Sequence, residues 1–85
     1  MYEVILSRQA QRLYDRVDRP TQARFRRALE DLTDNPTSGP NIVRLTNHPH
    51  GTHRYRVGGW RLIYRIENQR LVVYITKIEV RGDAY

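Results

Sequence analysis

A pair of consecutive glycines, Gly58-Gly59, is the feature that most constrains the fold of this chain. The two glycines separate two runs in which apolar and charged residues alternate, and this arrangement is the sequence signal of a tight two-residue β-hairpin. A turn at the glycines places Val57 opposite Trp60 and Arg56 opposite Arg61. The register matters for every position, because a slip of one residue would move each side chain to the other face of the sheet.

The alternation gives the predicted hairpin two unlike faces. One face is apolar and should be covered by helices; it consists of Tyr55, Val57, Trp60, Leu62, Tyr64 and Ile66. The other face carries arginines, which are Arg54, Arg56, Arg61 and Arg65. A turn at Asn68-Gln69 continues the meander, with Leu71, Val73 and Ile75 on the apolar face and Val72, Tyr74 and Thr76 on the arginine face.

The arginine face has two interpretations. Like charges opposite each other destabilise a strand pair by roughly 0.2–1 kcal/mol, so a bound anion would relieve the pairing of Arg56 with Arg61. Alternatively, each guanidinium extends into water, since one-sided sheets place polar residues outward in any case. The arginine series favours the anion-binding interpretation.

The first half of the chain predicts a strand and two helices. The β-branched-rich segment 2–6 predicts the strand, and Ser7 is a suitable cap for the helix that follows. The apolar stripes of the two helices are Ala10, Leu13, Tyr14 and Val17, and then Phe25, Ala28, Leu29 and Leu32. Asp18-Arg19 interrupts the helices, Pro20 begins the second one and Asn35-Pro36 ends it.

These segments together predict an α+β fold in the order β-α-α-β-β-β. A helical hairpin packs on one face of a small, mainly antiparallel sheet, and the direction of the first strand is left open. Residues 36–52 are expected to form a loop with a short strand near 42–45. A chain of 85 residues is expected to form a single domain over 1–85.

The composition points to an anionic partner. Lys and Arg number 15 against nine acidic residues, the net charge is +6, and all but one of the basic residues are arginines. Guanidinium binds phosphate through two parallel hydrogen bonds, so nucleic-acid binding is favoured. Cysteine is absent, which excludes disulfides and thiolate chemistry. The absence of a long apolar run or signal-like start predicts a cytoplasmic protein without a membrane segment.

The hairpin and the C-terminal segment carry a family resemblance. The run Arg54-Tyr-Arg-Val-Gly-Gly-Trp-Arg-Leu-Ile-Tyr-Arg-Ile66, with the ending Arg81-Gly-Asp-Ala-Tyr85, resembles the RelE family of toxin–antitoxin ribonucleases in the RelE/ParE superfamily. The similarity extends over nearly the whole chain. The gyrase-poisoning ParE branch shares the fold, and the long arginine series favours the ribonuclease branch.

The resemblance implies a toxin of a type II toxin–antitoxin pair. Its activity would be that of a metal-independent endoribonuclease, an mRNA interferase that cleaves mRNA in the ribosomal decoding site and inhibits translation. In this reaction the 2′-hydroxyl attacks its own 3′-phosphate, which requires a base, cations and an acid. The implied partners are the ribosome, mRNA and a cognate acidic antitoxin, and no cofactor is expected.

The resemblance also assigns roles to single residues. Arg61 matches the family's phosphate-binding arginine, and Arg54 and Arg56 match basic residues of the preceding strand; Arg65 extends this RNA-binding series. Tyr85 matches a terminal tyrosine that stacks on a base, and Arg81 is the arginine of the same terminal element. Glu79 departs from the family pattern, because some well-active members carry a further arginine there. It is either a general base or a structural partner of Arg81 or Lys77.

Several alternatives remain open at this point. The three histidines His48, His50 and His53 are expected in a loop, where they suggest a metal site only weakly because no carboxylate or cysteine lies nearby. One of them could instead serve as an acid or base. The acidic residues Glu30, Asp31 and Asp34 are expected to be solvated. Two other functions are a ParE-type toxin acting on DNA gyrase and a non-catalytic RNA-binding or ribosome-binding module.

Overall fold

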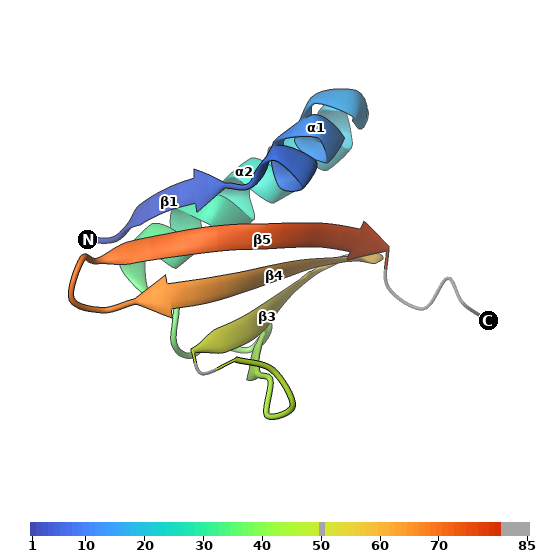
Figure 1. The fold of residues 1–85 in the computed structure, drawn as a ribbon. Helices are drawn as coiled ribbons and strands as arrows, with labels where there is room; N and C mark the ends of the chain where they lie inside the picture. The colour runs from blue at the N-terminus through green and yellow to red at the C-terminus, as the bar shows by residue number, and fades with distance from the viewer. Residues whose placement is uncertain (50, 81–85) are drawn as a thin grey trace.

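The computed structural model describes residues 1–49 and 51–80 and contains a five-stranded sheet with two helices on one face (Figure 1). The elements are β1 (Glu3–Leu6), α1 (Arg8–Arg16), α2 (Arg19–Asp34), β2 (Ile42–Arg44), β3 (Thr52–Val57), β4 (Trp60–Glu67) and β5 (Val72–Val80). The strand order is β1-β5-β4-β3-β2. β1 runs parallel to β5 and the other neighbours are antiparallel, which confirms the predicted fold class and resolves the direction of the first strand.

The two helices begin at capping side chains. The hydroxyl of Ser7 accepts a hydrogen bond from the Ala10 N–H at 3.2 Å, as predicted. The carboxylate of Asp18 accepts one from the Thr21 N–H at 3.1 Å, so the residue expected only to separate the helices also caps the second one. The hydrogen bonds from Thr21 lower the pKa of Asp18. Each cap satisfies a backbone N–H that has no partner within its helix.

The predicted apolar faces meet in one core. The buried residues of the two layers are Ala10, Phe25, Ala28 and Leu32 from the helices and Tyr55, Val57, Leu62, Tyr64, Val73, Ile75 and Ile78 from the sheet. Trp60 packs edge-on against Phe25 with ring centroids 5.5 Å apart. The buried hydroxyl of Tyr64 donates a hydrogen bond to the Pro36 carbonyl at 2.8 Å, and burial raises the pKa of Tyr64 far above its ordinary range. The predicted core face of the hairpin is confirmed.

Two predictions at the strand ends are wrong. Leu71 was expected in the core but its side chain is 47% exposed, because the turn after β4 extends over residues 68–71 and Leu71 occupies its last position with a φ of 54°. His53 was expected in a loop but belongs to β3. Its ring is buried and stacks on Tyr64 at a centroid distance of 5.6 Å.

A β-bulge in the middle of the sheet changes the facing of the last strand. Ile63 pairs with Lys77, whereas the next residue of β4 pairs with Ile75, so Thr76 is the extra residue. The Thr76 hydroxyl donates a hydrogen bond to the Ile63 carbonyl at 3.1 Å. An extra residue reverses the alternation beyond it. As a result, Ile78 points into the core and is 2% exposed, while Lys77 and Glu79 turn to the uncovered face.

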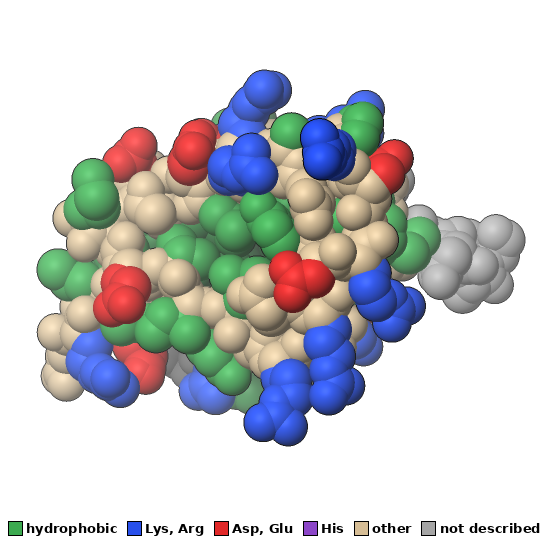
Figure 2. Space-filling view, turned by 90° about the horizontal axis from the view of Figure 1, so that it is seen from above, with side chains coloured by type: hydrophobic (Ala, Val, Ile, Leu, Met, Phe, Trp, Pro, Cys, Tyr) green, Lys and Arg blue, Asp and Glu red, His purple; other side chains and the backbone are tan. Residues whose placement is uncertain are grey.

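Across residues 1–49 and 51–80, neither helix is long and apolar enough to cross a membrane. Seen from above in the orientation of Figure 1, the molecule carries apolar side chains near its centre and basic side chains around much of its rim (Figure 2). Arginines also occur in both helices and in β3 and β4, so positive charge is not confined to one layer of the fold. The net charge alone therefore does not locate a functional site. The arrangement of side chains on the uncovered sheet face is needed to locate it.

Candidate functional site

The sheet face opposite the helices, here called the open face, carries its charged side chains in cross-strand rows. One row joins Arg56, Arg61 and Glu79 across β3, β4 and β5. The next row joins Arg54, Ile63 and Lys77, and the third contains Thr52, Arg65 and Tyr74. The predicted hairpin register is confirmed, so all four predicted arginines share this face.

Arg61 is engaged by a carboxylate on the neighbouring strand. Its Nη2 donates to Glu79 Oε2 at 2.6 Å, and Lys77 Nζ lies 3.4 Å from Glu79 Oε1. The side chains of Arg61 and Glu79 are only 27% and 28% exposed. Lys77 is one of the two partners that the sequence suggested for Glu79, whereas Arg61 was not suggested.

The same ion pair changes the interpretation of the arginine row. Arg56 does lie opposite Arg61, but Glu79 lies on the other side of Arg61 and supplies a negative charge from within the protein. The repulsion that we expected a ligand to relieve is therefore partly relieved by the fold. The Arg61 Nε is nevertheless buried and has no hydrogen-bond partner among residues 1–49 and 51–80. Arg61 thus has a further donor beyond the group that binds Glu79.

A cavity of about 470 Å³ lies on the open face around this ion pair. Its lining residues are Leu45, His48, Arg54, Arg61, Ile63, Thr76, Lys77 and Glu79. Three cationic side chains and one carboxylate thus line the cavity together with an imidazole, a hydroxyl and two aliphatic side chains. The strands supply most of these groups, while Leu45 and His48 come from the segment between β2 and β3, which in Figure 1 lies on the side of the sheet away from the helices.

The cavity contains some of the predicted site residues but not all of them. Arg54, Arg61 and Glu79 line it together. Arg56 shares the row of Arg61 and Glu79 but borders a different cavity, and Arg65 lies in the third row beside Tyr74. Arg81 and Tyr85 lie outside the described residues, as does His50.

Sequence reasoning missed the participation of Lys77 and the position of His48. The bulge had a signal, because the apolar residues of the last strand change from odd to even numbers between Ile75 and Ile78. No comparable signal exists for the segment between β2 and β3. Within the described part of the chain, no three His, Cys, Asp or Glu side chains come together in a way that could hold a metal ion.

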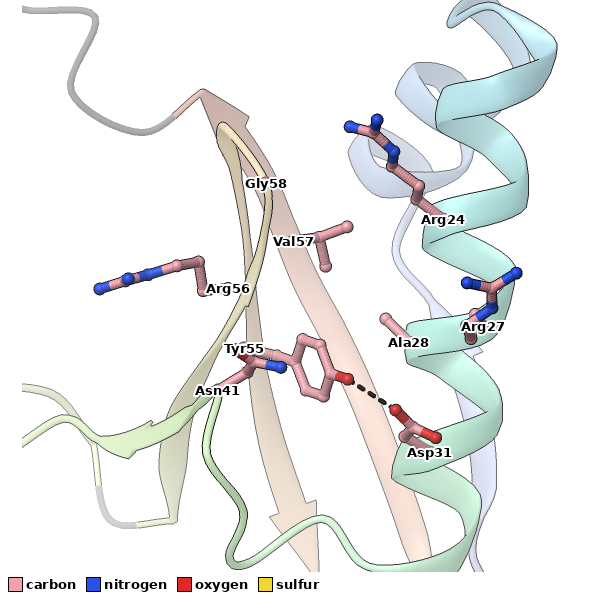
Figure 3. A pocket seen from close by; sticks show the side chains of 9 residues that line it. All are labelled: Arg24, Arg27, Ala28, Asp31, Asn41, Tyr55, Arg56, Val57 and Gly58. Carbon is pink, nitrogen blue, oxygen red and sulfur yellow. Dashed lines mark hydrogen bonds between the residues drawn. The ribbon is translucent and has the colours of Figure 1, made fainter.

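A second cavity, of about 350 Å³, lies between α2 and β3 (Figure 3). The Tyr55 hydroxyl donates a hydrogen bond to Asp31 Oδ2 at 2.7 Å there, and burial together with this carboxylate raises the pKa of Tyr55. Asp31 is exposed, as the sequence had suggested, and it also accepts this hydrogen bond. Arg24 points toward the hairpin turn while Arg56 points away from the helix (Figure 3). Because Arg56 points away from the space between α2 and β3 (Figure 3), its guanidinium does not join that of Arg24 there, and the cavity is a weaker candidate for binding an anion than the open face.

Comparisons with known proteins agree with this fold. The family model described as "ParE toxin of type II toxin-antitoxin system, parDE" matches residues 4–85. A RelE–RelB complex of Pyrococcus horikoshii contains a chain with 22% identity and a TM-score of 0.85, covering 96% of this chain and 97% of that one. A chain of the RelBE2 complex of Mycobacterium tuberculosis has 28% identity and a TM-score of 0.76, covering 94% of this chain and 98% of that one. The isolated E. coli RelE toxin has 15% identity and a TM-score of 0.82, covering 96% of this chain and 86% of that one. A comparison with curated protein sequences gave no match.

Proposed function

We propose that this chain, which belongs to the ParE toxin family of type II toxin–antitoxin systems and to the RelE/ParE superfamily, cuts messenger RNA in the decoding site of the ribosome. The chain is the toxin component of such a system. The endoribonuclease activity is the proposed part. It is supported above all by the cavity on the open face, where three cations and one carboxylate meet on a rigid sheet.

The proposed reaction begins with attack of a 2′-hydroxyl on the adjacent 3′-phosphate. Arg61 would bind the phosphate and stabilise the charge that grows in the transition state, an effect that is among the largest in enzyme catalysis. Glu79, hydrogen-bonded to Arg61 at 2.6 Å, would accept the proton of the 2′-hydroxyl. An ionised carboxylate only accepts hydrogen bonds, so this role suits it better than that of a proton donor.

The remaining basic residues would hold the RNA. Arg54 and Lys77 lie in the row next to Arg61, and Arg56 lies beside Arg61 itself. With Arg65 they form a series along the open face that matches a phosphate backbone better than a single anion. The terminal residues Arg81 and Tyr85 follow β5 directly in the sequence. We retain the proposal that Arg81 contributes charge and that Tyr85 stacks on a base near the cut.

The reaction as proposed requires no metal ion or cofactor. Guanidinium and ammonium groups supply the positive charge that a metal would otherwise provide. Arginine cannot release its proton near neutral pH, so the cavity relies on precise orientation of its substrate, which the ribosome would supply. Such a target would place the protein in the cytoplasm.

An antitoxin is the expected inhibitor. The structural neighbours from P. horikoshii and M. tuberculosis were solved as RelE–RelB and RelBE2 complexes, which supports an antitoxin partner for this chain. A net charge of +6 favours an acidic one. We propose that its acidic segment covers the open face and thereby blocks Arg54 and Arg61.

The second candidate function is that of a ParE-type toxin acting on DNA gyrase. The description of the matching family model favours it, since that model is named after ParE. The arginine series and the carboxylate in the open-face cavity favour cleavage of RNA instead. The two functions differ in their targets and can be separated in one set of assays.

A translation reaction from purified components tests the proposal directly. We expect messenger RNA that is truncated at the decoding site and carries a 5′-hydroxyl on its downstream fragment, with little cleavage when ribosomes are omitted. A parallel reaction contains gyrase and supercoiled DNA and should be unaffected. Intact mRNA together with gyrase-dependent DNA breaks would contradict the ribonuclease proposal and establish the gyrase alternative.

A further inference from the structure

We propose that His48 is the general acid of the cleavage reaction, protonating the 5′-oxygen that leaves the phosphate. The inference rests on the proposed endoribonuclease function and completes it, because Glu79 provides a proton acceptor but no donor. His48 lines the open-face cavity together with Arg54, Arg61 and Glu79. It therefore faces the same space as the proposed phosphate ligand and the proposed base.

The backbone around His48 is fixed on both sides. The Leu45 N–H donates a hydrogen bond to the Thr52 carbonyl at 3.0 Å. The N–H and hydroxyl of Thr52 in turn donate to the Pro49 carbonyl at 3.1 and 2.7 Å. These bonds join the segment that contains His48 to the first residue of β3. His48 thus belongs to a segment whose backbone is hydrogen-bonded to β3 beside the open face.

The chemistry of the other cavity residues leaves His48 as the proton donor. Arginine and lysine hold their protons near neutral pH, and a carboxylate is ordinarily ionised there. The Thr76 hydroxyl already donates to the Ile63 carbonyl at 3.1 Å. Imidazole, in contrast, titrates between about pH 5 and 8 and both donates and recovers a proton in that range. His48 is the one imidazole among the described residues that line the cavity.

His53 does not compete for this role. Its ring stacks on Tyr64, and its Nδ1 is 3.1 Å from the Gly51 carbonyl oxygen. It pairs with Tyr64 across the strands and so lies on the core side of the sheet. Its contacts are those of a packing residue, whereas His48 is exposed at the cavity wall.

Glu79 and His48, which line the same cavity, account for both proton transfers of the step. Glu79 takes the proton of the 2′-hydroxyl, and the 2′-oxygen forms a bond to phosphorus. The bond from phosphorus to the 5′-oxygen breaks, and that oxygen receives the proton of the His48 imidazolium. The products are a 2′,3′-cyclic phosphate and a 5′-hydroxyl, after which both side chains exchange protons with water. Arg61 remains beside the phosphate oxygens throughout.

A sulfur-substituted mRNA tests this assignment. Ribosomes are programmed with a synthetic mRNA in which sulfur replaces the bridging 5′-oxygen at the cleavage position. A thiol, with a pKa of roughly 8.5, leaves without needing a proton, so an acid catalyst becomes dispensable. We expect His48→Ala to slow cleavage of ordinary mRNA on the order of 100-fold and to cleave the sulfur-containing mRNA at a rate near that of the wild type.

The controls separate this role from positioning. Asn47→Ala changes the same loop without touching the cavity lining and should behave as the wild type on both substrates, and circular dichroism checks the fold of each variant. Equal slowing of His48→Ala on both substrates, or no slowing on either, would overturn the assignment. If instead Tyr85→Phe cleaves ordinary mRNA slowly and the sulfur-containing mRNA at the wild-type rate, the general acid is the terminal tyrosine and the assignment to His48 is overturned. If the wild type cuts neither mRNA, the ribonuclease proposal itself fails and His48 has no such role.

Discussion

The two faces of the sheet are built from the same strands but have opposite properties. On the face covered by helices, Leu62 and Tyr64 are completely buried. On the open face, Arg61 and Glu79 keep about a quarter of their side chains exposed and form an ion pair. Because side chains alternate along a strand, a residue that maintains the fold and a residue proposed for chemistry are immediate neighbours in the sequence. Stability and activity should therefore be separable at adjacent positions.

The faces also differ in how their polar atoms are satisfied. On the covered face, the hydroxyls of Tyr55 and Tyr64 each donate to a partner on or after α2, at 2.7 and 2.8 Å. On the open face, the Nε of Arg61 has no such partner within residues 1–49 and 51–80. Buried polar groups in stable cores are almost always hydrogen-bonded. The covered face therefore satisfies its buried hydroxyls, whereas the open face leaves the buried Arg61 Nε without a partner among the described residues.

The largest expected effect is on the covered face. Leu62→Ala should lower the free energy of unfolding by about 2–5 kcal/mol, because a fully buried leucine leaves a cavity when it is truncated. Leu71→Ala is the matched control, since Leu71 is 47% exposed and its loss should change the stability by less than about 0.5 kcal/mol. Urea denaturation followed by circular dichroism measures both. Similar losses for the two variants would mean that the core does not lie where the structure places it.

The next effect concerns activity on the open face. Arg61→Ala should reduce ribosome-dependent cleavage by roughly 100-fold through loss of transition-state stabilisation. Its effect on stability should stay within about 1 kcal/mol, because the ion pair with Glu79 is partly exposed and such pairs contribute little. Arg16→Ala, at the end of α1, removes a comparable charge and should retain full activity. A folded Arg61→Ala variant that cleaves at the wild-type rate would eliminate this residue from the site.

A smaller effect is expected at the terminal tyrosine. Stacking of a base on an aromatic ring contributes about 1–3 kcal/mol, so Tyr85→Ala should lower cleavage on the order of tenfold. Tyr85→Phe retains the ring and should remain near the wild type. The two variants are compared in the same single-turnover assay on programmed ribosomes. Equal losses in both would show that the hydroxyl, rather than the ring, takes part in the reaction.

The smallest effect should appear in the salt dependence of RNA binding. Five basic contacts on the open face predict that log K falls with log salt at a slope of about −4, taking roughly 0.7–0.9 per phosphate. Arg56→Ala should reduce the slope by about one contact while leaving the fold intact. Fluorescence anisotropy with a labelled single-stranded RNA, repeated at several salt concentrations, measures this slope. A slope near −1, or a slope that persists in the Arg56→Ala, Arg61→Ala double variant, would place the binding surface elsewhere.

The sequence by itself determined the hairpin, the helices and the division of the sheet into two faces. Gly58-Gly59 fixed the register that pairs Arg56 with Arg61, and the spacing of apolar residues identified the buried sides of both helices. These features depend on interactions between residues close along the chain. Such interactions leave periodic patterns and turn signals that can be recognised without knowledge of the rest of the fold.

Only the tertiary structure decided how the site is assembled. The bulge at Thr76 turns Glu79 toward Arg61, and it is accompanied by a hydrogen bond to Ile63, thirteen residues earlier. The parallel pairing of β1 with β5 joins the two ends of the described chain. The position of His48 depends on a loop that closes onto Thr52. These contacts join residues that are distant in the sequence, and the alternation of side chains along a strand does not predict them. The charged residues can therefore be read from the sequence, but only the fold determines which of them come into contact.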